Sequence, residues 1–366
     1  MIRTAESVAV GHPDKICDQI SDAILDACLE QDPTSRCAME VLGGHGIITV
    51  TGELTTNAYV NIREIVKKVY EDCGHSEDIG VTVNVVEQSP QIKSGVDNEG
   101  AGDQGIMVGY ATNETKEMLP LEVVLARNLV KAMGKHDGKA QVTIDNGKVI
   151  KILTSLCESG DMSDVTLVQE VHKLKKYLPK SIKTVEEIWL RNPNGAWTIG
   201  GFSADTGLTG RKLAVDNYGP TVPIGGGCFS GKDATKVDRS AAYMARKIAV
   251  DYLKARKARE VFVHIAYAIG VAEPLMAVAV IDGKQEKITA YDLRPRAIIE
   301  ALGLCKPQFR QTAKYGHFGN GFIWDQPSRM KTPPKIKAVK IAKTPKSPTV
   351  KSVKIVRQKT KTKTKK

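Results

Sequence analysis

A glycine-rich segment at residues 225–233 almost matches a nucleotide-binding phosphate loop. Four residues separate its second glycine from Gly231-Lys232, as the Walker pattern requires, but Asp233 stands where that pattern places the hydroxyl that reaches magnesium. Two prolines just upstream disfavour the buried strand from which such a loop starts. The segment is therefore a phosphate loop of another kind or a flexible glycine turn.

The residues after this segment predict a helix from Asp233 to about Arg256, with apolar residues three and four apart. Lys232 and Lys236 lie near its beginning. Glycine backbone, a helix N-terminus and two ammonium groups together suit an anion, so the pattern favours phosphate binding over a simple turn.

A second group of reactive residues opens another amphipathic helix at Gly11-His12-Pro13-Asp14-Lys15. Proline suits the first helical turn, where its missing N–H costs nothing. The group supplies a hydrogen-bond donor, a carboxylate able to bind metal, and a cation. Further carboxylates recur every four residues, and we expect them to form a solvated helix face: Asp18, Asp22 and Asp26.

A third group surrounds a single carboxylate with glycines, at Gly100-Ala101-Gly102-Asp103-Gln104-Gly105, ahead of a predicted strand at 106–110. Such a turn lets Asp103 project beside a closely approaching ligand or metal. Taken alone, it is equally typical of a tight turn.

These three segments, in this order and with comparable separations, resemble the S-adenosylmethionine synthetases (methionine adenosyltransferases). The resemblance covers residues 2–327 and extends through further motifs at 51–56, 88–90, 207–212, 236–243, 267–274 and 315–319. Any one motif is weak, but their ordered coincidence is highly specific.

The resemblance implies that methionine sulfur attacks C5′ of ATP and releases triphosphate, which is then hydrolysed to pyrophosphate and phosphate. A thioether needs no general base, but the leaving group gains charge that cations must stabilise. The family's fold is α/β of the α+β type, with three similar βαβ-type domains related by a pseudo-threefold axis. Its subunits pair through flat sheet faces, as a homodimer or a dimer of dimers, with active sites between subunits.

Site roles follow from the same resemblance. The implied catalytic residues are His12, Lys15, Arg211, Lys232 and Lys236. Those implied to bind ATP are His12, Asp137, Lys139, Trp197, Asp205, Arg211, Lys212, Cys228 and Lys232, and those implied to bind methionine are Glu53, Gln88, Asp103, Asp205 and Lys236. Two Mg²⁺ ions are assigned to Asp14 and Asp238, and K⁺ to Glu40.

Plain structural roles compete for three of these residues. Trp197 also fits a core position, Glu40 an exposed strand and Asp137 a loop. Two departures from the family pattern are Val10, where glutamate is expected, and Cys228, where alanine is usual. Residues 89–99 resemble the family's mobile gate.

The net charge of +12 is concentrated at the C-terminus. Residues 331–366 carry thirteen lysines, one arginine and no acidic residue, so subtracting their +14 leaves −2 for residues 1–330. This tail is predicted to be disordered and suits contact with nucleic acid or another polyanion, or a solvated extension. The expected domains are 1–99, 100–204 and 205–330.

Strands are predicted at 46–52, 81–86, 140–144 and 149–153, and helices at 57–73, 121–133, 162–177 and 296–302. The apolar stretch at 261–281 is interrupted by charged residues and proline, which predicts two buried strands and no membrane span. Seven scattered cysteines and a polar N-terminus favour a cytoplasmic protein. A P-loop ATPase or kinase, and a nucleic-acid-binding protein acting through the tail, remain the alternatives.

Overall fold

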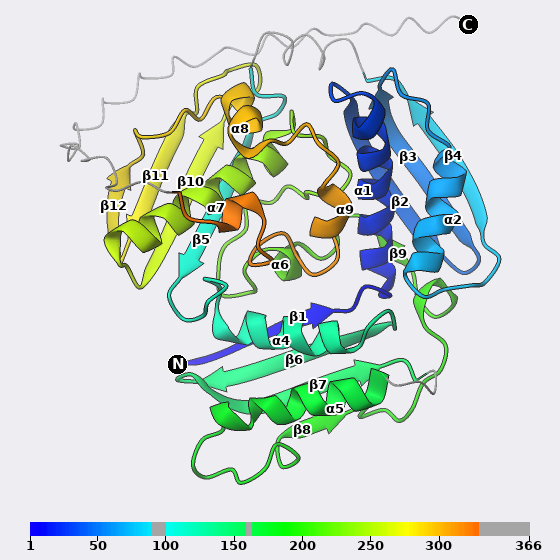
Figure 1. The fold of residues 1–366 in the computed structure, drawn as a ribbon, viewed down its shortest axis with the longest axis vertical. Helices are drawn as coiled ribbons and strands as arrows, with labels where there is room; N and C mark the ends of the chain where they lie inside the picture. Colours follow the sequence, from blue (N-terminus) through cyan, green and yellow to red (C-terminus); the bar gives the residue numbers. More distant parts are fainter. Residues whose placement is uncertain (89–99, 159–162, 329–366) are drawn as a thin grey trace, which may run out of the picture.

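The computed structural model describes residues 1–88, 100–158 and 163–328, which form three helix-covered sheets on three sides of the molecule (Figure 1). The predicted gate at 89–99 and the basic tail at 331–366 lie outside the described residues.

The first third of the chain forms a strand, a long helix, a hairpin, a second helix and a last strand. Its elements are β1 (Ile2–Val8), α1 (Pro13–Gln31), β2 (Arg36–Gly44), β3 (Ile47–Thr55), α2 (Ile62–Asp72) and β4 (Gly80–Val86).

The second third repeats this order. Its elements are β5 (Gly105–Thr112), α4 (Leu121–Ala132), β6 (Gly138–Asp145), β7 (Lys148–Leu156), α5 (Ser163–Lys173), η1 (Leu174–Tyr177) and β8 (Trp189–Arg191).

The last third follows the same plan with extra short turns, and its final strand forms a hairpin. It comprises η2 (Gly201–Ser203), β9 (Gly207–Leu208), α6 (Leu213–Asp216), α7 (Val237–Arg256), β10 (Glu260–Tyr267), β11 (Met276–Ile281), β12 (Lys284–Lys287), α8 (Pro295–Leu302), α9 (Phe309–Thr312) and η3 (Ile323–Asp325).

Each third donates its first strand to the edge of another third's sheet. The sheet orders are β1-β6-β7-β8, β5-β10-β11-β12 and β9-β2-β3-β4. In all three the donated strand pairs antiparallel with the hairpin, and only the last strand differs, being parallel in two sheets and antiparallel in the third. This cyclic exchange is the predicted pseudo-threefold, although no repeat is visible in the sequence.

The predicted elements are present, with shifted starts at two helices. α7 begins at Val237 rather than Asp233, because the Asp233 carboxylate accepts hydrogen bonds from the backbone N–H groups of Cys37 (2.7 Å) and Thr235 (2.8 Å) and so shapes a turn. α2 begins at Ile62, where the Asn61 side chain caps the helix. The 261–281 stretch forms two strands, as predicted.

The prediction of a solvated carboxylate face on α1 was wrong. Asp18 and Asp22 are fully buried and Asp26 is partly buried, because each accepts hydrogen bonds from backbone amides of chain segments that cross the helix. The spacing of four residues reflects these crossings rather than exposure to water. No helix within the described residues is long and apolar enough to cross a membrane.

Candidate active site

A cavity of about 480 Å³ collects the residues predicted to lie on the nucleotide side. It lies where the start of α1, the start of β6 and the segment 192–205 meet. Its lining includes five of the predicted ATP-binding residues: His12, Asp137, Lys139, Trp197 and Asp205. The volume suits a small-molecule ligand.

His12 is the N-cap residue of α1 and is almost completely buried. Its Nδ1 accepts a hydrogen bond from the backbone N–H of Asp14 at 3.2 Å, so the neutral ring carries its proton on Nε2. Burial, together with the nearby charges of Lys212 and Lys139, lowers the pKa of His12 to about 3. The ring is therefore a neutral hydrogen-bond donor at physiological pH.

Asp14 is held by two basic side chains from the segment after β9. Lys212 donates a short hydrogen bond to one carboxylate oxygen, and Arg211 Nε lies 3.1 Å from the other. The Leu208 backbone N–H also donates to Asp14, at 3.0 Å. Burial acts to raise the pKa of Asp14, but the hydrogen bonds from Lys212 and Leu208 outweigh it and the pKa is lowered. Asp14 is therefore an ionised carboxylate.

Lys15 does not face the cavity. It is 1% exposed, and its ammonium lies 3.0 Å from Asp18 and 2.6 Å from Asp216. The predicted contact of Lys15 with phosphate would require this buried pairing to break.

Asp137 and Trp197 occupy different depths of the cavity wall. Asp137 is buried and accepts a hydrogen bond from the Gly201 backbone N–H at 2.9 Å, while burial raises its pKa. Trp197 is half-buried, so it is not a core residue. Asp205 also lines the cavity, is exposed, and accepts a hydrogen bond from the Thr206 backbone N–H at 2.7 Å.

A second group of predicted residues lies on the outward face of the β9-β2-β3-β4 sheet. Glu53 pairs across the sheet with Ala38, which in turn forms an isolated bridge with Lys232. Glu40, two residues further along β2, is on the same face and exposed. Burial raises the pKa of Glu40, and Lys232 opposes the increase.

Gln88, another predicted methionine-binding residue, lies just beyond the end of β4. Its backbone N–H donates to Thr55 at the end of β3, so Gln88 and Glu53 lie at the same edge of a parallel strand pair. Within the described part of the chain, the buried Oε1 of Gln88 has no hydrogen-bond partner. A buried acceptor without a partner suits a ligand that donates a hydrogen bond.

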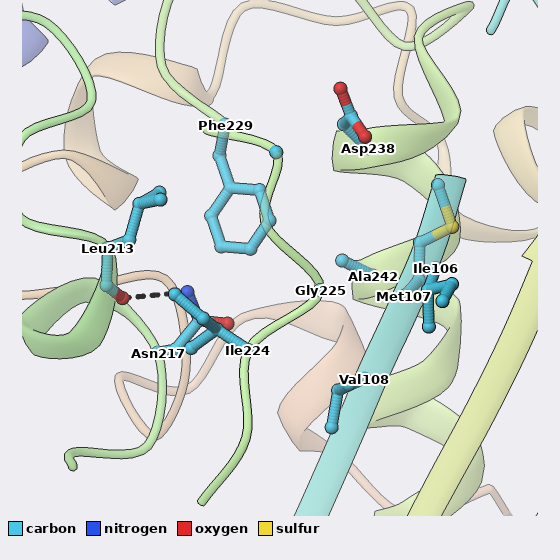
Figure 2. Close-up of a pocket in the computed structure, with 11 residues that line it drawn as sticks. Ile106, Met107, Val108, Leu213, Asn217, Ile224, Gly225, Phe229, Asp238 and Ala242 are labelled. Atoms are coloured by element: carbon cyan, nitrogen blue, oxygen red, sulfur yellow. Dashed lines mark hydrogen bonds between the residues drawn. The ribbon is translucent and has the colours of Figure 1, made fainter. Parts of the chain in front are cut away.

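The glycine segment packs Asp238, in the first turn of α7, against β5 (Figure 2). A Cβ on Gly227 would lie 2.2 Å from the Asp238 carboxyl carbon, and one on Gly225 would lie 1.9 Å from the Ile106 carbonyl oxygen. Lys232 lies 2.6 Å from Asp238. The glycines therefore give the chain close access to a strand and to a carboxylate.

Three further predicted residues are Lys236, Cys228 and Asp103. Lys236 lies 2.5 Å from Asp233, and Cys228 packs against Gly210, where burial raises the pKa of its thiol. Asp103 is exposed on the loop before β5. Burial acts to lower the pKa of Lys232, but the nearby Cys228 thiol and the hydrogen bond to Asp238 outweigh it, so the pKa is raised.

The candidate metal ligands fit a site completed by substrate. Asp14 and Asp238 are single carboxylates in separate groups, and the described ranges contain no cluster of three His, Cys, Asp or Glu residues. Mg²⁺ is commonly held by one or two carboxylates together with substrate phosphates, so this donor set suits it. Each carboxylate also pairs with a lysine, Asp14 with Lys212 and Asp238 with Lys232.

Comparison with known proteins places this arrangement in a family. Three domain families match the chain in order: S-adenosylmethionine synthetase, N-terminal domain (residues 1–96), central domain (98–197) and C-terminal domain (199–326). The chain belongs to the S-adenosylmethionine synthetase family. It therefore synthesises S-adenosylmethionine from ATP and methionine. This function is favoured over the alternatives of a P-loop ATPase or kinase and a nucleic-acid-binding protein.

Individual relatives agree over almost their full lengths. The S-adenosylmethionine synthase of Petrotoga mobilis is 41% identical, with 90% of this chain and 97% of the relative covered. That of Pseudothermotoga lettingae is 44% identical, with 88% and 95% covered. Enzymes that use ATP generally depend on a divalent metal.

Proposed function

We propose that the reaction is a direct displacement, in which the methionine sulfur bonds to C5′ of ATP as the C5′–O bond breaks. Triphosphate leaves and is hydrolysed to pyrophosphate and phosphate. The sulfur carries no proton to remove, so the demand on the protein is electrostatic. The observation that carries this proposal is that His12 and Lys139 line one cavity, while Arg211 and Lys212 pair with Asp14, two residues after His12.

His12 is suited to the leaving oxygen because its Nε2–H is fixed as a donor. A neutral donor can strengthen its hydrogen bond as negative charge develops, whereas the lysine and arginine charges act over the whole triphosphate. Trp197 would support adenine, with Asp137 and Asp205 on the ribose side. Asp205 would also reach methionine, together with Glu53, Gln88, Asp103 and Lys236.

Two Mg²⁺ ions would be held by Asp14 and Asp238 with triphosphate oxygens, and K⁺ by Glu40 beside Cys228. When bound, these cations would neutralise phosphate charge.

The active site would be completed by a second subunit. Within the described residues, no hydrogen bond or ion pair joins the His12–Asp14 group to the Lys232–Asp238 group. The second group shares its outward sheet face with exposed Leu42, which is 50% exposed and pairs with Leu208. A partner sheet packed on this face would cover the apolar side chains and bring its own first group to complete the site.

Mixing two inactive variants tests this arrangement. Asp14→Asn damages the first group and Asp238→Asn the second. If each site combines groups from two subunits, co-expression should restore about a quarter of wild-type turnover through mixed dimers with one intact site. If both groups serve one site within a chain, no mixture should recover activity.

The seven cysteines form no disulfide, which supports a cytoplasmic location. The basic tail would add contact with a polyanion such as nucleic acid.

A further inference from the structure

Helix α1 carries a ladder of four carboxylates, Asp14, Asp18, Asp22 and Asp26, on one face. Each accepts hydrogen bonds from the backbone of a segment that crosses the helix. Successive members are about 6 Å apart along the axis, because four residues of helix rise by that amount. The ladder thus fixes the spacing between distant chain segments.

Near the N-terminal end of α1, the ladder holds the segment that carries Arg211 and Lys212. The Asp18 carboxylate accepts the Gly210 backbone N–H at 2.8 Å, directly before Arg211. A second oxygen of Asp18 pairs with the buried Lys15. The carboxylate is fully enclosed, so it cannot swing away to another partner.

The middle of the ladder holds the segment that carries Lys232. Asp22 accepts the Gly231 backbone N–H at 2.8 Å and pairs in bidentate fashion with Arg239, at 2.6 and 2.8 Å. Arg239 in turn donates to the carbonyl oxygen of Lys232 at 3.0 Å. The backbone N–H of Gly231 and the backbone carbonyl of Lys232 are therefore each held by a fully buried side chain.

We propose that Asp18 and Asp22 are positioning residues, which fix the backbone of the two cation-bearing segments and so aim Arg211 and Lys232. This inference rests on the proposed roles of those two cations. A displacement of about 1 Å at a charged catalytic group can cost roughly 100-fold in rate, so backbone clamping of this kind affects turnover.

Asp26 provides a matched control on the same helix face. It accepts the backbone N–H groups of Gln308, Phe309 and Arg310 at 2.9 Å each, and so caps α9, which carries none of the proposed catalytic cations. Its removal should lower stability with little effect on turnover.

The experiment compares alanine and asparagine variants at Asp18, Asp22 and Asp26 in the full-length protein. Turnover and KM are measured well below each melting temperature. Asp18→Ala and Asp22→Ala should lower kcat about 10- to 100-fold with little change in KM for methionine. Asparagine keeps an acceptor oxygen, so Asp18→Asn should recover most of the lost turnover, which a loss of stability alone would not explain.

If Asp22→Ala fails to fold around the unpaired Arg239, Asp18 alone decides the question. The inference is overturned if Asp18→Ala keeps kcat within twofold of wild type, or loses no more than Asp26→Ala. Arg211→Ala and Lys232→Ala separate the two levels of the argument. If these leave kcat unchanged, the proposed roles of the cations fail. If they lower kcat while Asp18→Ala does not, only the positioning role fails.

Discussion

The imidazole of His12 accepts a hydrogen bond from the backbone N–H of Asp14, two residues later, at the first turn of α1. This hydrogen bond joins His12, a proposed catalytic residue, to the backbone of Asp14, a proposed metal ligand. It also fixes the imidazole proton on Nε2, which is the nitrogen free to donate.

The low pKa of His12 predicts a pH dependence of stability. Between pH 6.5 and about 3 the unfolded chain protonates this histidine but the folded protein does not, so the free energy of unfolding should fall as pH falls through that window. Urea unfolding at pH 7.5 and 5.0 measures the change. His12→Asn should show a smaller decrease, and an equal decrease in both proteins would contradict the assignment. Burial also lowers the pKa of His317, but both proteins contain this histidine, so its contribution to the pH dependence cancels in the comparison.

Replacing either proposed magnesium ligand should abolish most activity without unfolding the protein. Asp14→Asn and Asp238→Asn each remove a charged oxygen at constant size, so turnover should fall roughly 100- to 1,000-fold. Circular dichroism checks the fold, and Mn²⁺ binding in the presence of tripolyphosphate provides a readout independent of turnover. Asp145→Asn serves as the control, at a partly exposed carboxylate that pairs with the N-terminal ammonium. Near-normal turnover in either folded variant would show that the metal assignment is wrong.

Gly227 should be as sensitive as a catalytic residue. Alanine there would place its Cβ 2.2 Å from the Asp238 carboxyl carbon, which must move away from its position beside Lys232. We expect Gly227→Ala to lower kcat about tenfold or more. Gly80→Ala is the control, because its nearest neighbour atom would be 3.5 Å away. Equal turnover in both variants would mean that Asp238 needs no fixed position.

The basic tail should be separable from catalysis. Deleting residues 331–366 should leave kcat and Tm nearly unchanged but remove binding to DNA or RNA at low ionic strength, since all of the excess positive charge lies there. Binding of the full chain should weaken steeply with salt. Loss of turnover in a folded deletion variant would mean that the tail contributes to the active site.

Hydrophobic periodicity predicted most helices and strands, because apolar spacing reflects burial against a neighbouring layer. It did not predict that β1, β5 and β9 leave their own thirds of the chain, since strand exchange depends on long-range pairing. Motif order placed His12, Lys139 and Trp197 in one site before their shared cavity was known.

The α1 carboxylates show where sequence reasoning failed. Four-residue spacing on a helix predicts one face but does not tell whether water or backbone amides cover it, so Asp18 and Asp22 were wrongly assigned to solvent. Arg239 was missed for the same reason, because its partner Asp22 is 217 residues away. Fully buried charges need partners, and those partners cannot be identified from one local segment.

Product analysis tests the central claim most directly. The purified full-length protein is incubated with ATP, L-methionine, Mg²⁺ and K⁺, and every product is quantified. We expect S-adenosylmethionine, pyrophosphate and phosphate in equal amounts, with no turnover to S-adenosylmethionine when methionine is omitted. ADP as the main product, or ATP hydrolysis that does not depend on methionine, would contradict it.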